Sequence, residues 1–245
     1  MKVFIVYAHH EPSSFNAAMR SAANKTLTDA GHQVVESDLY AMGFDPVSDR
    51  RNFTTVKDPA ILIQQDEESY ANLHDGYVAE IKAEQAKLAW CDCLILQFPI
   101  WWLGMPAILK GWVDRVFSVG HAYGGGRWFD QGRLAGKQAM CSITVGGLEP
   151  VYTEVGIYGA METILYPIHR GILGFCGFTV RQPFIVYAPV RLTHEARVTV
   201  LKDYQERLLN LDKTPIIKNP KVEDYEGFIL KSAIAERSPY PKKST

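Results

Sequence analysis

The sequence of 245 residues lacks an apolar run long enough to cross a bilayer, which takes about 20 consecutive residues as a helix. Its longest apolar stretch, residues 93–109, is interrupted by Gln97, Pro99 and Gly104. The opening residues 1–8 carry one lysine and too short an apolar segment for a secretory signal. We therefore expect no membrane span and no signal peptide.

An excess of charge of one sign is also missing. Lys and Arg together number 26, Asp and Glu together number 27, and the formal net charge is -1. Nucleic-acid binding usually requires a basic face, so this balance predicts no nucleic-acid partner.

Cysteine is scarce. The four residues Cys91, Cys93, Cys141 and Cys176 are not spaced as a disulfide framework, a CxxC redox pair or a zinc knuckle. With no secretory signal, this usage predicts reduced, buried thiols in a cytoplasmic protein.

What the sequence does contain is an alternation of strand and helix patterns. Hydrophobic residues make up 47% of the chain, which is enough for a folded core. The alternation predicts an α/β protein with a five-stranded parallel sheet and helices on both faces. The expected strands are 2–7, 33–38, 93–98, 139–145 and 179–187, and the expected helices are 15–30, 78–90, 106–117, 161–173 and 196–211.

Two segments fall outside this alternation. Residues 43–77 show no clean period and form a long insertion, for which a functional or packing role is expected. From Thr214 the chain is polar and rich in proline. We therefore divide the chain into one main domain, 1–213, and a short irregular C-terminal arm, 214–245.

Polar residues follow the first strand directly and lead into a helix. The segment 8–17 contains His9, Ser13 and Ser14. A helix N-terminus offers unpaired N–H groups and the positive end of the helix dipole, and together these bind phosphate. The alternative is that Ser13 or Ser14 only caps the helix.

Two further segments follow the third and fourth strands. Trp101 and Trp102 are adjacent and cannot both point into one core, so at least one should be exposed or bound to a flat ligand, the alternative being a core or interface tryptophan. Gly146 and Gly147 would let the backbone approach a ligand, unless they form an ordinary turn. Because the carboxyl ends of parallel strands share one edge, the three segments together predict a nucleotide-type ligand there.

These segments belong to longer motifs that resemble the NAD(P)H:quinone oxidoreductase (DT-diaphorase) family. The resemblance covers residues 3 to 216 and is carried by 14–16, 36–42, 97–99, 102–117, 142–147 and 171–178. It implies a flavodoxin-like three-layer sandwich and a homodimer. It also implies FAD, with FMN less favoured, and a two-electron reduction of quinones by NAD(P)H through ping-pong hydride transfer at flavin N5.

The resemblance also implies roles for individual residues. The expected cofactor contacts are His9, Ser14, Phe15, Asn16, Ala17, Pro99, Ile100, Trp101, Trp102, Leu103, Thr144, Val145, Gly146, Gly147, Tyr152 and Arg197. The expected substrate contacts are Trp102, Tyr123, Gly125 and Phe175, with Tyr123 donated across a dimer interface.

The chain departs from the family pattern at several positions. Tyr158 stands where relatives have a histidine, so Tyr152 and Tyr158 are the expected catalytic pair. A second pocket tyrosine is replaced by glycine at Gly125, which should open the loop. Trp101 stands where relatives commonly have glutamine. His169 lacks the second histidine of a relative's metal site, so no metal is expected.

Other functions fit the same resemblance. Within the enzyme class, the alternative is an azo- or nitroreductase that uses FMN or FAD. Outside it, the alternative is a regulatory flavoprotein subunit of a transporter. A flavodoxin-type electron carrier would be shorter and more acidic than this chain.

Overall fold

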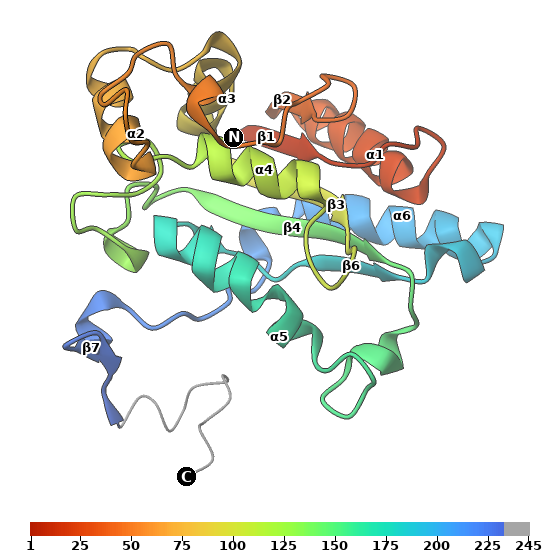
Figure 1. The fold of residues 1–245 in the computed structure, drawn as a ribbon. Helices are drawn as coiled ribbons and strands as arrows, with labels where there is room; N and C mark the ends of the chain where they lie inside the picture. The colour runs from red at the N-terminus through yellow and green to blue at the C-terminus, as the bar shows by residue number, and fades with distance from the viewer. Residues whose placement is uncertain (233–245) are drawn as a thin grey trace.

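The computed structural model describes residues 1–232 and has a parallel sheet at its centre (Figure 1). The strand order is β2-β1-β3-β4-β5, the order of doubly wound flavodoxin-like sheets, so the predicted fold class is confirmed. The strands are β1 (Lys2–Tyr7), β2 (Gln33–Asp38), β3 (Cys93–Pro99), β4 (Gln138–Val145), β5 (Thr179–Val180) and β6 (Phe184–Tyr187).

The strand predicted over 179–187 is divided into two short pieces. β5 pairs with the start of β4 and β6 pairs with its end. Between them, the N–H of Gln182 donates to the carbonyl of Pro215 at 2.8 Å, and Pro183 has no N–H to donate. The carbonyl of Pro215, in the C-terminal segment, therefore accepts a hydrogen bond from the gap between β5 and β6. The prediction of one unbroken fifth strand was wrong at this point.

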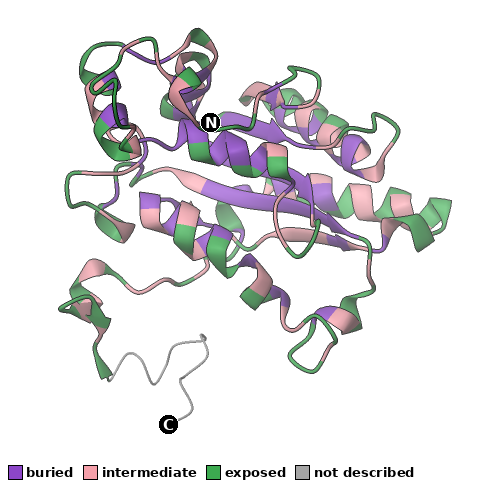
Figure 2. Ribbon diagram, in the orientation of Figure 1, coloured by how far each residue is buried: buried purple, intermediate pink, exposed green. Residues whose placement is uncertain are grey.

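Residues 1–232 contain six α-helices, and all but the second pack on the two faces of this sheet. They are α1 (Phe15–Asp29), α2 (Gln64–Leu73), α3 (Ala79–Trp90), α4 (Ala107–Val116), α5 (Met161–Tyr166) and α6 (His194–Leu209). Phe4 and Val6 face a core that includes α3, α4 and α5, whereas Val3 and Ile5 face α1 and α6. Alternate residues of β1 thus serve opposite faces, and the central strands are buried on both sides (Figure 2).

The helix predicted over 161–173 changes its winding partway along. It is α-helical to Tyr166 and continues as a π-helix over Pro167–Gly174. Proline has no N–H for the usual bond and clashes with the preceding turn, so the helix widens where Pro167 enters.

The insertion 43–77 contains regular structure that its sequence does not reveal. A 3-10 turn, Arg50–Asn52, and helix α2 lie within it. The buried residues of α2 include Glu67 and Glu68, which partner groups from other segments. Charged residues therefore occupy positions where an apolar period would normally appear, which is why the sequence did not indicate this helix.

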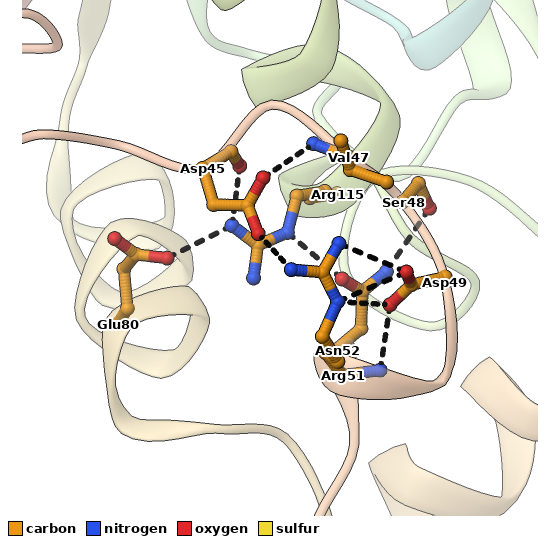
Figure 3. Close-up of polar contacts among 8 residues, drawn as sticks. All are labelled: Asp45, Val47, Ser48, Asp49, Arg51, Asn52, Glu80 and Arg115. Carbon is orange, nitrogen blue, oxygen red and sulfur yellow. Dashed lines mark hydrogen bonds and ion pairs between the residues drawn. The ribbon is translucent and has the colours of Figure 1, made fainter.

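Arg115 fastens this insertion to α4 and α3. The side chain is almost wholly buried and donates to the Asn52 side chain at 2.8 Å, to the Asp45 carbonyl at 2.6 Å and to Glu80 at 2.8 Å (Figure 3). Its guanidinium also lies over the ring of Phe44 at 5.0 Å. One cation on α4 thus holds the insertion against the domain.

The described part of the C-terminal arm ends in a small antiparallel hairpin, β7 (Tyr225–Glu226) and β8 (Ile229–Leu230). Tyr225 stacks on Phe129 at 6.0 Å and bonds to Arg170. Residues 233–245 of the predicted arm lie outside the described residues, and the division at residue 213 stays a prediction. Within 1–232, no helix is long and apolar enough to span a bilayer.

Candidate active site

The three polar segments begin side by side at one edge of the sheet. Beyond the strands, the N–H of Ala8 donates to the carbonyl of Gln97 at 3.0 Å, and the N–H of Ile100 donates to that of Thr144 at 2.9 Å. This continuing ladder fixes where the loops start. We call the region formed by residues 8–17, 99–105 and 144–158 the carboxyl edge.

Helix α1 presents its N-terminus at the carboxyl edge. The Ser14 hydroxyl accepts a hydrogen bond from the N–H of Ala17 at 3.1 Å, so Ser14 is the N-cap. The N–H groups of Phe15 and Asn16 lie in the first turn, where no carbonyl within the helix can accept them. The arrangement offers free donors and a positive dipole end to an anion. Phosphate binding here stays a prediction.

His9 lies beside this helix terminus. The N–H of Glu11 donates to His9 Nδ1 at 3.0 Å, so the neutral ring carries its proton on Nε2. Partial burial, and then the neighbouring His10, lower the pKa of His9. The ring also stacks on His10 at 4.9 Å. Sequence reasoning missed His10, although its position beside His9 at the end of a strand was a usable signal.

Trp102 lies in a tight turn that exposes its side chain to solvent. Trp101 and Gly104 exchange two backbone hydrogen bonds of 3.0 Å, and the two residues between them, Trp102 and Leu103, have φ of 50° and 57°. Positive φ at both central positions defines a type I′ turn, which side chains other than glycine adopt at a cost of about 1–3 kcal/mol each. The turn leaves the Trp102 side chain fully exposed. The expectation that one tryptophan is uncovered within the chain is confirmed.

Trp101 takes a different position from its neighbour. Its ring lies 6.1 Å from that of His9 and 5.8 Å from that of His10. The two histidines and this tryptophan form an aromatic cluster next to the N-terminus of α1. The sequence position occupied by glutamine in relatives is thus part of a ring cluster in this chain.

The two glycines after β4 have different surroundings. A Cβ at Gly147 would lie 3.0 Å from the ring and the hydroxyl of Tyr152, and 3.0 Å from Val151. A Cβ at Gly146 would meet nothing within 4 Å. Gly147 is therefore required by packing within the chain, whereas only Gly146 is open toward the carboxyl edge.

Tyr152 and Tyr158 lie together, as the proposed catalytic pair requires. Their ring centroids are 5.4 Å apart, and the N–H of Tyr158 donates to the carbonyl of Val151 at 3.0 Å. Tyr152 is buried and Tyr158 is about half exposed. Their catalytic role stays a prediction.

Asn16 differs from the expected flavin contact in the direction of its side chain. Its amide donates to the Thr144 hydroxyl at 2.8 Å and accepts from Gln97 at 2.7 Å, so the side chain points into the domain. Arg197 is also engaged within the chain, with bonds to the carbonyls of Pro189 and Val190 at 3.1 and 3.2 Å. The other predicted cofactor residues at the carboxyl edge are Ala17, Pro99, Ile100, Leu103 and Val145.

The predicted substrate residues other than Trp102 lie elsewhere. Tyr123 and Gly125 lie in the loop before β4, whereas Gly146 follows it, so they stand at opposite ends of that strand (Figure 1). The ring of Phe175 lies 6.3 Å from that of Tyr123. We call this region, with α2 and residues 118–126, the amino edge.

A cavity of about 610 Å³ opens at the amino edge. Its lining residues include Gln64, Glu68, Asp114, Phe117, Tyr123 and Phe175. The buried Glu68 accepts from the N–H of Val119 at 2.8 Å and from the Tyr123 hydroxyl at 3.2 Å. Burial, and then the charge of Glu68, raise the pKa of Tyr123 to about 12, so its phenol stays protonated. Glu68 was missed because its only sequence signal was an acidic cluster.

Residues that could have held a metal do not gather. His169 is buried, and burial lowers its pKa to about 4. Its Nε2 has no hydrogen-bond partner. Within residues 1–232 no group of three or more His, Cys, Asp or Glu side chains could hold a metal ion. All four cysteines are buried free thiols.

The sheet order and the edge just described define a flavodoxin-like α/β protein, and the family profile described as flavodoxin-like fold matches residues 1–208. NAD(P)H dehydrogenase [quinone] 1 from Cavia porcellus is 40% identical over 241 residues, covering 96% of this chain and 88% of that protein. Ribosyldihydronicotinamide dehydrogenase [quinone] from Homo sapiens is 38% identical over 213 residues, covering 86% and 92%.

A solved structure from Klebsiella pneumoniae, described as that of a quinone reductase, superposes with a TM-score of 0.89. It is 36% identical and covers 96% of this chain and 93% of its own. The chain therefore belongs to the NAD(P)H:quinone oxidoreductase family.

Proposed function

We propose that this chain reduces quinones with NAD(P)H and holds FAD at the carboxyl edge. One observation carries the proposal: the free N-terminus of α1, the exposed Trp102 and the open backbone at Gly146 lie at one edge. The helix N-terminus would bind a phosphate, the ring of Trp102 would stack on a flat ring, and the backbone at Gly146 would approach the edge of that ring. The flavin would supply hydride acceptance and donation at N5, which no amino-acid side chain offers.

The chain's own residues would bind and orient the reactants. The first turn of α1 and His9 Nε2 would donate hydrogen bonds to phosphate oxygens. The exposed ring of Trp102 would form a wall for flat substrates that enter in turn. Because nicotinamide and quinone would occupy one place, ping-pong kinetics are expected. Arg197 would lie toward the adenine end.

Tyr152 and Tyr158 would stabilise negative charge on the reduced cofactor by donating neutral hydrogen bonds. The motivating observation is the packing of the two phenols at 5.4 Å between ring centroids. Because Tyr158 stands where relatives have a histidine, this pair contains no imidazole, and flavin reduction should be nearly flat between about pH 5.5 and 8.5. A titration near pH 6.5 in stopped-flow reduction by NAD(P)H would overturn this role.

The substrate pocket would be completed by a second copy of the chain. The eight residues of β4 separate the carboxyl edge from the amino edge by about 26 Å, so Tyr123 cannot reach Trp102 of its own chain. Several apolar side chains are also bare, among them Val155, Ile157 and Leu73. A homodimer with two-fold symmetry would bring the two edges together twice.

A second candidate function has support at the amino edge. The residues Gly124, Gly125 and Gly126 all have positive φ, and a Cβ at Gly125 would meet nothing within 4 Å. This loop is open where a relative has a tyrosine, which favours bulkier acceptors such as azo or nitro compounds.

The decisive experiment identifies the bound flavin and tests turnover on the same sample. The flavin released on denaturation should have the mass of FAD, and steady-state NAD(P)H oxidation should be rapid with a simple benzoquinone. Release of FMN, with faster turnover of azo or nitro acceptors, would favour the second candidate. Bound flavin with no turnover of any acceptor would indicate a regulatory subunit instead.

A further inference from the structure

Four buried polar side chains form one hydrogen-bonded chain beneath the carboxyl edge. The Tyr204 hydroxyl donates to Gln97 Oε1 at 3.2 Å, Gln97 Nε2 donates to Asn16 Oδ1 at 2.7 Å, and Asn16 Nδ2 donates to Thr144 Oγ1 at 2.8 Å. We call these four residues the buried polar chain. It joins α6, β3, α1 and β4, which are distant in the sequence.

The burial of these groups is too complete to be incidental. Tyr204 and Gln97 are 0% exposed, Asn16 is 2% exposed and Thr144 is 6% exposed. Position 97 lies in a strand whose other residues are apolar, where a leucine would avoid the cost of burying an amide. Hydrogen bonds among buried polar groups hold a specific arrangement in exchange for that cost.

The buried polar chain has a direction. Each member donates to the next, and the sequence of donors ends at the Thr144 oxygen. Because Thr144 accepts from Asn16, its own hydroxyl proton must point elsewhere. Thr144 lies two residues before Gly146, at the carboxyl edge. Burial raises the pKa of Tyr204, which keeps the first donor of the series protonated.

We propose that Gln97 and Tyr204 are positioning residues for the cofactor. Through Asn16 they fix the first turn of α1 against β4, and they leave the Thr144 hydroxyl as a hydrogen-bond donor toward the flavin. This inference rests on the proposed flavin site. It assigns a role to two residues that do not themselves touch the ligand.

The test compares two buried tyrosines. Tyr204→Phe removes one hydroxyl while its ring keeps its packing against Phe184 at 4.8 Å. Tyr77→Phe is the matched control, because Tyr77 is also buried and its hydroxyl also donates over 3.2 Å, but to the Glu68 carbonyl. FAD binding to the flavin-free protein is measured by quenching of flavin fluorescence, and Tm is measured alongside.

We expect both variants to lower Tm similarly, and Tyr204→Phe alone to weaken FAD binding, by about fivefold for one hydrogen bond. Equal FAD affinity in the two variants would overturn the proposal. Failure of the unmodified protein to bind any flavin would instead overturn the proposed function.

A double-mutant cycle separates positioning from general destabilisation. Thr144→Val should weaken FAD binding and Thr144→Ser should restore it, because serine keeps the hydroxyl. In the Thr144→Val background, Tyr204→Phe should have little further effect on FAD affinity, since the group that it orients is gone. Fully additive losses of FAD affinity would show that Tyr204 acts independently of Thr144 and would contradict the proposal.

Discussion

The carboxyl edge and the amino edge of this molecule are built by different means. At the carboxyl edge, short loops continue the hydrogen-bonded ladder of a parallel sheet, as at Ala8 and Ile100, and lead to the N-terminus of α1. At the amino edge, an insertion and a glycine loop are held by buried charges on Arg115 and Glu68. The geometry of the carboxyl edge is set by the parallel sheet, whereas the geometry of the amino edge depends on the insertion 43–77.

This difference explains how one fold could keep a cofactor while its acceptor changes. The loops at the carboxyl edge start where the register of the strands places them, so they cannot move unless the strands move as well. The insertion is attached through a few side chains, so its pocket can change while the cofactor edge stays the same. Changes at one edge should therefore leave the other intact, and the predictions below test this independence.

The largest effect is expected from Arg115→Met. Removal of this buried cation leaves the buried Asn52 side chain and the Asp45 carbonyl without a donor, and the half-buried Glu80 without its ion-pair partner. Stability should therefore fall by about 3 kcal/mol, or about 10 °C in Tm. Lys110→Met on the same helix breaks only the exposed pair with Asp114 and should cost less than about 1 kcal/mol. Calorimetry measures both. If Arg115→Met also abolished FAD binding at a temperature where it is folded, the two edges would not be independent.

Lowering the pH should reduce the free energy of unfolding, because the buried His169, near the amino edge, resists protonation in the folded protein. The pKa of this buried ring is lowered to about 4, so between about pH 6.5 and 4 only the unfolded chain takes up its proton. Stability that is present above pH 6.5 should thus be lost as pH falls to about 4, by about 3 kcal/mol. In His169→Gln this part of the acid limb should flatten. Denaturant titrations at several pH values, with the exposed His194→Gln as control, check it.

Gly147→Ala and Gly146→Ala should separate packing from ligand approach. A Cβ at position 147 would crowd Tyr152, so Gly147→Ala should lower the stability of the flavin-free protein by about 1–3 kcal/mol. A Cβ at position 146 meets open space, so Gly146→Ala should leave that stability unchanged and weaken only FAD binding. Equal stability losses in the two variants would contradict the distinction.

Trp102→Ala should have the smallest effect on the folded protein and a clear effect on turnover. The fully exposed ring makes no packing contribution, so Tm should not change. Loss of a stacking surface should lower kcat/KM for quinone about tenfold, while FAD stays bound through backbone contacts. Loss of FAD with unchanged turnover per bound flavin would reverse this assignment.

The sequence predicted the parts of the molecule that depend on local pattern. Continuous apolar runs marked β1, β3 and β4, and two adjacent tryptophans implied that one is uncovered. It did not predict α2, because its buried face carries Glu67 and Glu68, which pair with the N–H groups of Lys57 in the same insertion and of the distant Val119.

The same limit applies within the site. The inward direction of Asn16 depends on Gln97, 81 residues away, and on Thr144, 128 residues away. Similarly, the break between β5 and β6 depends on a carbonyl from Pro215. Side-chain direction is set by partners that only the folded chain brings together, so motif spacing alone could not supply it.

The central claim, that one active site uses the carboxyl edge of one copy and the amino edge of another, is tested most directly by mixing two inactive variants. One carries Gly146→Trp at the carboxyl edge, and the other carries Tyr123→Ala with Phe175→Ala at the amino edge. After subunit exchange, about half of the dimers should be mixed, with one intact site each, so quinone turnover should recover to about 25% of the unmodified protein. Recovery of no activity above the sum of the two separate variants would contradict the account.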